Sequence, residues 1–274
     1  LAADYVHIGD SNINIKFPPQ LKVICNYSTW RKHRTEENVY PELTIDEYIN
    51  ENIEGLKFLY LSGKDCIDKK FINLINRDKA LVLLLDTYNN HGLVDQRNLF
   101  CNLMNFNIKV PIIIGRYYHN LSLGQLQIDA SIDIGGLFVD GLGDGLFISH
   151  NNTISVHEVN NLSFEILQST RTRITKTDFI SCPSCGRTQF DLMETTAMVR
   201  ERTSHLKGLK IAIMGCIVNG PGEMADADYG YVGTGLKKIS LYKGHNVIKK
   251  DISAEKSVDE LIHLIKENGD WIEP

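Results

Sequence analysis

Long apolar runs and an excess of basic residues are both absent from this chain of 274 residues. Its longest apolar runs, residues 80–85 and 110–114, fall far short of the roughly 20 residues that a membrane-spanning helix needs. The 29 basic and 34 acidic residues give a formal net charge of −5, so no global positive field attracts nucleic acid or anionic lipid. We therefore expect a soluble protein with neither a nucleic-acid nor a membrane partner.

Cysteine is scarce for a protein built on disulfides, because the chain holds only 6. Three of them lie between positions 182 and 216, which favours reduced thiols with a function and a reducing compartment. Ser-His-Asp order, H-E-x-x-H and Walker motifs are missing, so a hydrolase lacks support. The first ten residues show no Met, basic region or apolar region, and we expect a fragment of a longer protein.

What is present is the composition of an ordinary globular protein, with 43% apolar and 23% charged residues. Between residues 56 and 147, short apolar runs alternate with amphipathic ones. The expected strands cover residues 57–61, 80–85, 110–114 and 136–139, and the expected helices cover 69–76, 94–106 and 156–170. Continuous apolar strands separated by helices indicate a parallel sheet covered on both faces. The sequence therefore predicts an α/β domain that is a barrel or barrel-like.

A polar stretch, residues 170–177, is the predicted boundary before a second α/β module of about 100 residues. Expected strands there cover 178–182, 210–214, 238–242 and 246–252, with a long helix over 190–207 and a glycine-rich turn after residue 214. Gly208 is expected to end the long helix, and a capping box from Ser257 to Glu260 to open a last helix that Gly269 ends. The first 55 residues are the hardest to interpret.

The sharpest motif is a pair of cysteines, Cys182 and Cys185, in the order C-P-S-C, followed 31 positions later by Cys216. A C-x-x-C pair lets two sulfurs point at one metal centre. Cys216 follows the strand predicted at 210–214, so both loops are expected to meet at the same edge of one sheet. Three thiols at one place predict a metal or cluster site that is one ligand short.

The fourth ligand that the sequence offers is Glu223, seven residues after Cys216 across an Asn-Gly-Pro-Gly turn. A structural zinc normally has four nitrogen or sulfur ligands. Three thiolates and one oxygen instead suit a cubane cluster with one exchangeable iron. That iron could bind a substrate oxygen, which the amide of Asn219 could orient.

Other interpretations of these residues stay open at this point. C-x-x-C also occurs in redox pairs and half zinc ribbons. His205 or His245 could complete a structural zinc site with the three cysteines, and a fully thiolate-ligated cluster would make an electron carrier. Glu223 alone is a solvated carboxylate more often than a ligand, and Asn219 could be an ordinary turn residue.

Residues 181–187 and 211–233, and more loosely 136–144, resemble the 4-hydroxy-3-methylbut-2-enyl diphosphate synthase family of iron–sulfur oxidoreductases. From Val110 onward the chain is similar to the plastid-type form with three domains. The resemblance implies a degenerate TIM-barrel-like insertion domain over residues 1–174 and a smaller α/β iron–sulfur domain over 175–274. The substrate-binding barrel that precedes them in the family is not recognised in this chain.

By the same resemblance, Cys182, Cys185, Cys216 and Glu223 bind a [4Fe–4S] cluster, and Glu223 and Asn219 are catalytic. The implied reaction converts 2-C-methyl-D-erythritol 2,4-cyclodiphosphate to 4-hydroxy-3-methylbut-2-enyl diphosphate by two-electron reductive ring opening. It belongs to the methylerythritol phosphate route to isoprenoids. The implied partners are ferredoxin or flavodoxin and the missing barrel, and a homodimer is a candidate assembly. A plastid-type organelle is the expected location, with the bacterial cytoplasm as the alternative.

Weaker features receive structural interpretations. Phe147 stands where two-domain members of the family have an Arg that helps to hold the diphosphate, so we expect this barrel not to bind substrate and the isolated chain to be inactive. Residues 140–145 are expected to form a structural turn. The basic run Arg171, Arg173 and Lys176 is expected to be a solvated helix end, with docking of an acidic electron donor or of the diphosphate as the alternative. Cys25, Cys66 and Cys101 are expected to be small buried hydrophobes.

Overall fold

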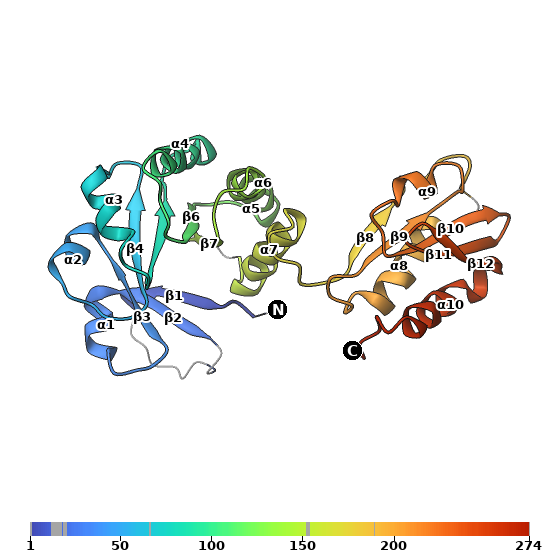
Figure 1. Cartoon of the computed structure of the whole chain (residues 1–274), viewed down its shortest axis with the longest axis horizontal. Helices are drawn as coiled ribbons and strands as arrows, with labels where there is room; N and C mark the ends of the chain where they lie inside the picture. Colours follow the sequence, from blue (N-terminus) through green and yellow to red (C-terminus); the bar gives the residue numbers. More distant parts are fainter. Residues whose placement is uncertain are drawn as a thin grey trace. The chain divides into compact units, whose positions relative to one another are not determined.

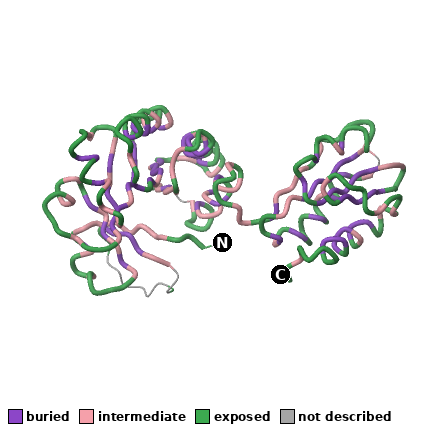
Figure 2. Tube along the Cα trace, viewed as in Figure 1, coloured by how far each residue is buried: buried purple, intermediate pink, exposed green. Residues whose placement is uncertain are grey.

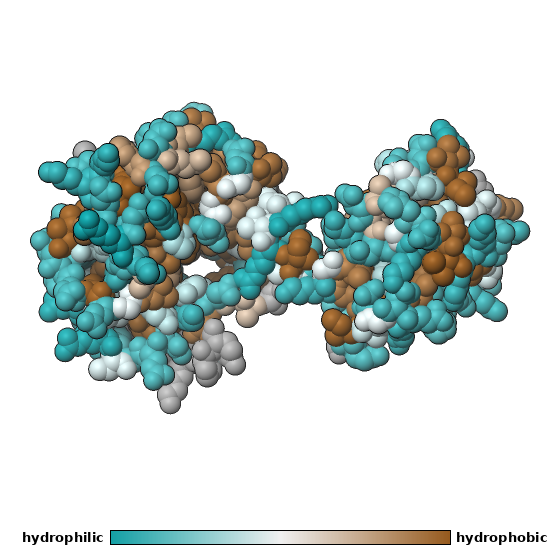
Figure 3. Space-filling model, in the orientation of Figure 1, coloured by the Kyte–Doolittle hydropathy of each residue, from teal (hydrophilic) through white to brown (hydrophobic). Residues whose placement is uncertain are grey.

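A computed structural model describes residues 2–11, 18, 21–65, 67–151, 154–188 and 190–273. The chain divides into two compact units, Leu1–Arg173 and Ile174–Pro274, so the passage between them lies inside the polar stretch 170–177. Among the described residues, no helix combines the length and the apolar character needed to cross a membrane. The face in Figure 3 is mostly hydrophilic, with the hydrophobic residues scattered singly or in small groups.

Unit 1 is built on a curled parallel sheet, which confirms the α/β class (Figure 1). Its strands lie side by side in chain order and are all parallel. They are β1 (Tyr5–Gly9), β2 (Lys22–Asn26), β3 (Val39–Leu43), β4 (Lys57–Ser62), β5 (Leu81–Asp86), β6 (Ile112–Tyr118) and β7 (Gly145–His150). The curl brings the rings of His7 in β1 and Phe147 in β7 to 5.1 Å between centroids.

The helices of unit 1 cover the outer face of this sheet. They are α1 (Tyr27–His33), α2 (Ile45–Asn50), α3 (Lys69–Ile75), α4 (Gly92–Asn105), α5 (Leu123–Ala130), the π-helical turn η1 (Ser131–Gly135), α6 (Gly136–Val139) and α7 (Val156–Ser169). Capping boxes at Thr44, Ser122 and Ser155 open three of them. Leucines of the central strands, such as Leu59 and Leu83, have no exposure and belong to the core of unit 1. Figure 2 shows the buried stretches of the chain in purple.

One predicted strand of unit 1 is wrong. Residues 136–139 are the helix α6, which continues the helical path of α5 and η1. Leu137 and Phe138 are buried in the core whereas Val139 is exposed, and such a short apolar run does not distinguish a strand from a helical turn. The strand that completes the sheet is β7, beyond the turn at 140–145.

That turn is structural, as predicted. Asp144 donates its N–H to the carbonyl of Ile112 at 2.7 Å and accepts from the N–H of Ile112 at 2.8 Å, which fixes the start of β7 beside β6. Asp140 forms an ion pair with Arg97 of α4. Gly143 has φ of +85°, and a Cβ there would lie 2.6 Å from Cδ1 of Ile114, so a side chain does not fit.

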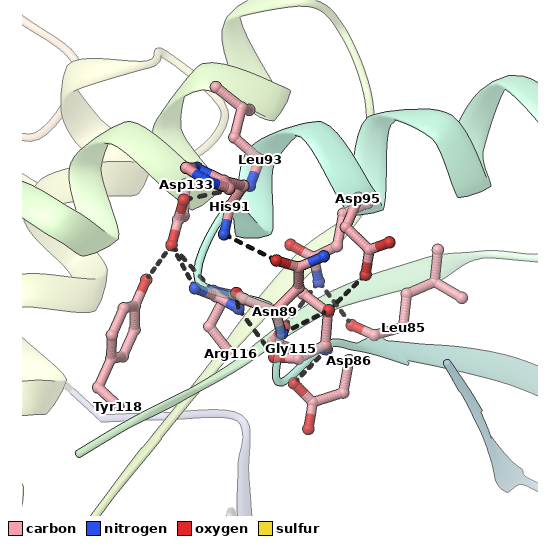
Figure 4. A network of polar contacts seen from close by, with 12 residues as sticks. Leu85, Asp86, Asn89, His91, Leu93, Asp95, Gly115, Arg116, Tyr118 and Asp133 are labelled. Carbon is pink, nitrogen blue, oxygen red and sulfur yellow. Dashed lines mark hydrogen bonds and ion pairs between the residues drawn. The ribbon is translucent and has the colours of Figure 1, made fainter. Parts of the chain in front are cut away.

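A buried polar network ties the carboxyl ends of β5 and β6 to the helices (Figure 4). The guanidinium of Arg116 pairs with the carboxylate of Asp133 in η1, with 2.8 Å between Nη2 and Oδ2, and donates to the carbonyl of Thr87 at 2.8 Å. Asp133 also accepts from the hydroxyl of Tyr118 at 3.3 Å and from the N–H of Leu93 at 3.1 Å. The charges are therefore paired and hydrogen-bonded, as burial requires.

Unit 2 holds a mixed sheet in the order β12-β11-β10-β9-β8. Its strands are β8 (Asp178–Ser181), β9 (Lys210–Met214), β10 (Tyr229–Gly235), β11 (Lys238–Lys243) and β12 (Asn246–Ser253), and its helices are α8 (Leu192–Thr203), α9 (Gly220–Glu223) and α10 (Ala254–Glu267). Strands β8, β9 and β10 are parallel, and β11 and β12 continue the sheet as an antiparallel meander. Buried side chains of β9, β10 and β11 pack against α8 and α10.

Two helix boundaries in unit 2 differ from the prediction. Helix α8 starts after the cap Asp191 and ends at Thr203, so Gly208 lies in a turn before β9 and does not end the helix. Helix α10 starts at Ala254, and Ser257 lies inside it. The hydroxyl of Ser257 donates to the carbonyl of Ala254 and lies 2.6 Å from the hydroxyl of Tyr231, so this serine forms a core contact instead of a cap. Gly269, with φ of +77°, does follow the end of α10.

Candidate metal centre

Parallel strands place the two cysteine loops at one sheet edge, as predicted. Strands β8 and β9 are neighbours, with Ser181 opposite Ile213. Cys182 directly follows β8, and Cys216 follows β9 after one glycine, Gly215. The carboxyl ends of both strands therefore deliver their thiols to the same side of the sheet.

A cavity of about 100 Å³ lies at this edge, and the predicted site residues line it. All five of them, Cys182, Cys185, Cys216, Asn219 and Glu223, are among its lining residues. The rest of the lining is Pro183, Ser184, Met214, Gly215 and Gly220. The fold thus gathers three thiols, a carboxylate and an amide around one small space.

The three thiols differ in exposure but all are free. Cys182 and Cys216 are half-buried, and Cys185 is exposed. The backbone N–H of Gly215 donates to Sγ of Cys182 at 3.2 Å, so the second cysteine loop is hydrogen-bonded to a thiol of the first. Hydrogen bonds from backbone N–H groups to cysteine sulfur stabilise thiolate ligands and tune iron–sulfur clusters.

A tightly wound turn carries Asn219 and Glu223. The carbonyl of Asn219 accepts from the N–H groups of Gly222 at 3.1 Å and Glu223 at 3.0 Å. Met224 follows, only 1% exposed, and anchors the turn in a small core behind the cavity. A Cβ on Gly220 would lie 2.9 Å from Cβ of Met214, so glycine lets the turn approach β9. The backbone is held from behind while the carboxylate of Glu223 stays exposed.

The donor set fits a cluster with one ligand that can exchange. Among the described residues, no group of three or more His, Cys, Asp or Glu side chains is gathered closely enough for a single metal ion. The three thiols and Glu223 line the same cavity. Three sulfur donors and one oxygen donor match a [4Fe–4S] cluster that keeps one iron open.

Neither histidine of the zinc alternative belongs to this cavity. Nε2 of His205 is hydrogen-bonded to the carbonyl of Ile272 at 2.8 Å, and its ring packs edge-on against Trp271. His245 is exposed in the turn between β11 and β12. Both side chains are accounted for elsewhere in unit 2, so the structure does not favour a zinc site completed by histidine.

The remaining cysteines separate into three cases. Cys25 in β2 has no exposure, and burial raises the pKa of its thiol to about 11, so its prediction as a buried hydrophobe is confirmed. The same prediction for Cys101 is wrong, because α4 buries Leu99, Phe100 and Leu103 and leaves position 101 on its outer side. Cys66 lies outside the described residues.

The basic run has a structural role at one position at least. Arg173 forms an ion pair with Asp4, and its guanidinium lies 5.3 Å from the ring centroid of Phe164. All three residues belong to unit 1, so Arg173 connects α7 to the residues that precede β1. Arg171 has φ of 59°, as expected where a helix ends.

Comparison with known proteins agrees with the motifs. Residues 178–267 match the family described as the GcpE protein C-terminal domain. A 4-hydroxy-3-methylbut-2-en-1-yl diphosphate synthase (flavodoxin) of Parabacteroides distasonis is 43% identical over 271 residues, which are 98% of this chain and 43% of that protein. The chain belongs to the 4-hydroxy-3-methylbut-2-en-1-yl diphosphate synthase family. The family resemblance inferred from the cysteine motifs is thereby confirmed.

The similarity extends further than the motifs indicated. A second synthase named for flavodoxin, from Phocaeicola vulgatus, is 40% identical over 98% of this chain. The matched region is 44% of that protein. The chloroplastic synthase (ferredoxin) of Arabidopsis thaliana is 50% identical over 182 residues, or 65% of the chain. The chain spans less than half the length of these curated relatives. The first 109 residues, where no motif was recognised, also align with the bacterial synthases.

Proposed function

We propose that this chain supplies the iron–sulfur part of a synthase that converts 2-C-methyl-D-erythritol 2,4-cyclodiphosphate to 4-hydroxy-3-methylbut-2-enyl diphosphate. Two electrons enter, one C–O bond of the ring and one C–OH bond break, a C=C bond forms, and one oxygen leaves as water with protons from the medium. The observation that carries the proposal is the cavity lined by three free thiols together with Glu223 and Asn219.

In this proposal, Cys182, Cys185 and Cys216 hold a [4Fe–4S] cluster, with Glu223 as the fourth ligand. When bound, such a cluster supplies electrons one at a time and a Lewis acid for the oxygen of the bond that breaks. The strand ends and the Gly215 N–H fix the positions of the thiolates. The exposure of Cys185 and Glu223 leaves the open side of the cavity toward an incoming substrate.

Glu223 and Asn219 have the chemistry for the substrate side of the reaction. The carboxylate of Glu223 would be the exchangeable ligand of the cluster, and beside the substrate it can accept or donate a proton. Asn219 presents an amide with both donor and acceptor atoms at the same cavity. Because the turn beneath them is anchored by Met224, both side chains can act without movement of the backbone.

We assign unit 1 as the degenerate barrel inserted between the substrate-binding barrel and the cluster domain. Its seven parallel strands in chain order support this assignment. Phe147 packs its ring against His7, so the position of the expected Arg is used for packing. Beside the cavity of unit 2, Ile217 and Val218 are 48% and 62% exposed, an apolar rim that a covering substrate barrel would bury. The isolated chain should therefore be inactive.

Flavodoxin or ferredoxin is the proposed electron donor, since the relatives carry these names. Of the two locations expected from the sequence, the relatives that align over 98% of the chain support the bacterial cytoplasm more than a plastid-type organelle, because they are bacterial.

Anaerobic reconstitution with iron and sulfide tests the proposal. About four iron and four sulfide per chain, with one unique iron, are expected. EPR spectra of the reduced cluster should change when the cyclic diphosphate is added to the full-length synthase. Stoichiometric zinc without sulfide would support a structural zinc module instead and contradict the proposal. A cluster with unchanged spectra would support the other alternative, a pure electron carrier, and would contradict the proposal.

A further inference from the structure

Thr188 closes the loop that carries Cys182 and Cys185. The N–H of Cys185 donates to Oγ1 of Thr188 at 3.1 Å, and the N–H of Thr188 donates back to the carbonyl of Cys185 at 2.9 Å. Oγ1 of Thr188 also lies 3.1 Å from Oγ of Ser184, which has a left-handed backbone with φ of 67°. A single hydroxyl therefore fixes the loop between the two cysteines.

The same threonine lies against the second cysteine loop. A Cβ on Gly215 would lie 2.7 Å from Oγ1 and 3.0 Å from Cγ2 of Thr188, so the threonine side chain packs directly on the glycine backbone. From another direction, a Cβ on Gly233 of β10 would lie 2.5 Å from the carbonyl oxygen of Gly215. Gly215 is thus enclosed between Thr188 and β10, one residue before Cys216.

Together these contacts place Thr188 between the two backbone segments that carry the three thiols. Thr188 bonds to the backbone of Cys185 and packs on Gly215, and Gly215 donates its N–H to Sγ of Cys182 and is followed by Cys216. Thr188 is not among the residues that line the cavity. It is thus placed to set the spacing of the thiols from behind them.

We propose that Thr188 is a positioning residue for the metal centre: its hydroxyl holds the Cys182–Cys185 loop and its methyl group spaces that loop from Cys216. The inference rests on the proposed function, since the thiols must share one cluster for their spacing to matter. Groups that orient metal ligands typically change metal affinity by about 10–100-fold when they are removed. Thr188 also occupies the N–H of Cys185, which its loss would leave available to sulfur.

Two variants separate the roles of the hydroxyl and the methyl group. Thr188→Val keeps the branched shape against Gly215 and removes the hydroxyl, whereas Thr188→Ser keeps the hydroxyl. Thr203→Val is a matched control, because Thr203 is a buried threonine whose hydroxyl donates to the carbonyl of Val199 in α8, at the other end of β8. The full chain and each variant are reconstituted anaerobically, and iron loss to a chelator and the cluster reduction potential are measured.

Thr188→Val should lose iron about tenfold faster than the wild type. Its reduction potential should become more positive, because an added N–H bond to sulfur favours the reduced cluster. Thr188→Ser should keep the wild-type potential, and Thr203→Val should keep both values. If the wild type assembles no cluster, the proposed function itself fails. If Thr188→Val matches the wild type, or if Thr203→Val shifts both values equally, the cluster proposal stands and the role of Thr188 is rejected.

Discussion

The two units use the carboxyl ends of their parallel strands in opposite ways. In unit 1, Arg116, near the carboxyl end of β6, and Asp133 of η1 are buried, and they form an ion pair and hydrogen bonds with nearby backbone. In unit 2, the segments that follow β8 and β9 carry Cys185 and Glu223, which are exposed and line a cavity. Similar strand geometry thus gives a closed structural network in one unit and an available ligand set in the other. This difference supports the site proposed in unit 2.

The largest expected effect comes from removing one of the three thiols that line the cavity. Cys182 and Cys185 follow β8, whereas Cys216 follows β9. Because Cys216→Ser removes the single thiol of the second loop, reconstitution should yield almost no stable cluster. Iron and sulfide analysis after anaerobic desalting measures this loss. Cys101→Ser is the matched control, because Cys101 is an exposed thiol of unit 1 and should leave iron content unchanged. A fully loaded and stable Cys216→Ser variant would remove Cys216 from the ligand set.

The second effect separates cluster binding from catalysis. Glu223→Ala should still assemble a cluster on three thiolates but should lower turnover of the full-length synthase by about 10²–10⁴-fold, the usual range for a lost acid–base group. Steady-state rates with the cyclic diphosphate and a reduced donor measure this loss. Glu201→Ala, an acidic residue of α8, serves as the control. Undiminished turnover in Glu223→Ala would contradict the assigned role.

A third change removes the buried ion pair between Arg116 and Asp133 in unit 1. Arg116→Met leaves Asp133 buried without its cation, which typically costs about 3–5 kcal/mol of unfolding free energy. Arg97→Met is the control, because the ion pair of Arg97 with Asp140 is about four-tenths exposed and should cost less than about 1 kcal/mol. Urea unfolding of the two variants measures both costs. Equal costs would show that burial does not distinguish these pairs.

The smallest effect concerns pH. Burial raises the pKa of Asp86, at the end of β5, above its ordinary value. The folded state therefore holds the proton more tightly than the unfolded state. This contribution is fully present below the ordinary pKa of aspartate and is lost as pH rises through the raised pKa. Asp86→Asn should remove this slope, so urea unfolding from pH 4 to 7 should favour the variant increasingly. Parallel curves would contradict the assignment.

The comparison also explains which predictions from the sequence succeeded. The cysteine spacing, the strand at 210–214 and the Asn-Gly-Pro-Gly-Glu turn are local patterns. They were sufficient to predict five residues that all line one cavity. Thr188 was missed because its importance comes from a hydroxyl bond and a close packing on Gly215, a contact across 27 positions. Local spacing carries no signal for such a contact.

The elements that were predicted wrongly or missed have related explanations. In residues 136–139, Leu137 and Phe138 are apolar because they pack into the core from a helical turn, and a short apolar run is compatible with a strand as well. Ser257 fits a capping box, but its hydroxyl is taken by Tyr231 and by Ala254 one turn earlier. Strand β10 contains Gly230, Gly233 and Gly235, so it was hidden in a turn-like composition. In each case the local pattern fits more than one structure, and packing against the rest of the unit decides between them.

The most direct measurement of the central claim is iron and sulfide content with EPR after anaerobic reconstitution of the whole chain. The account predicts about four iron and four sulfide per chain and a reduced cluster with one distinct iron. Zinc bound in equal amount to the chain and no sulfide would contradict it, as would a cluster that Cys182→Ser, Cys185→Ser and Cys216→Ser variants all retain.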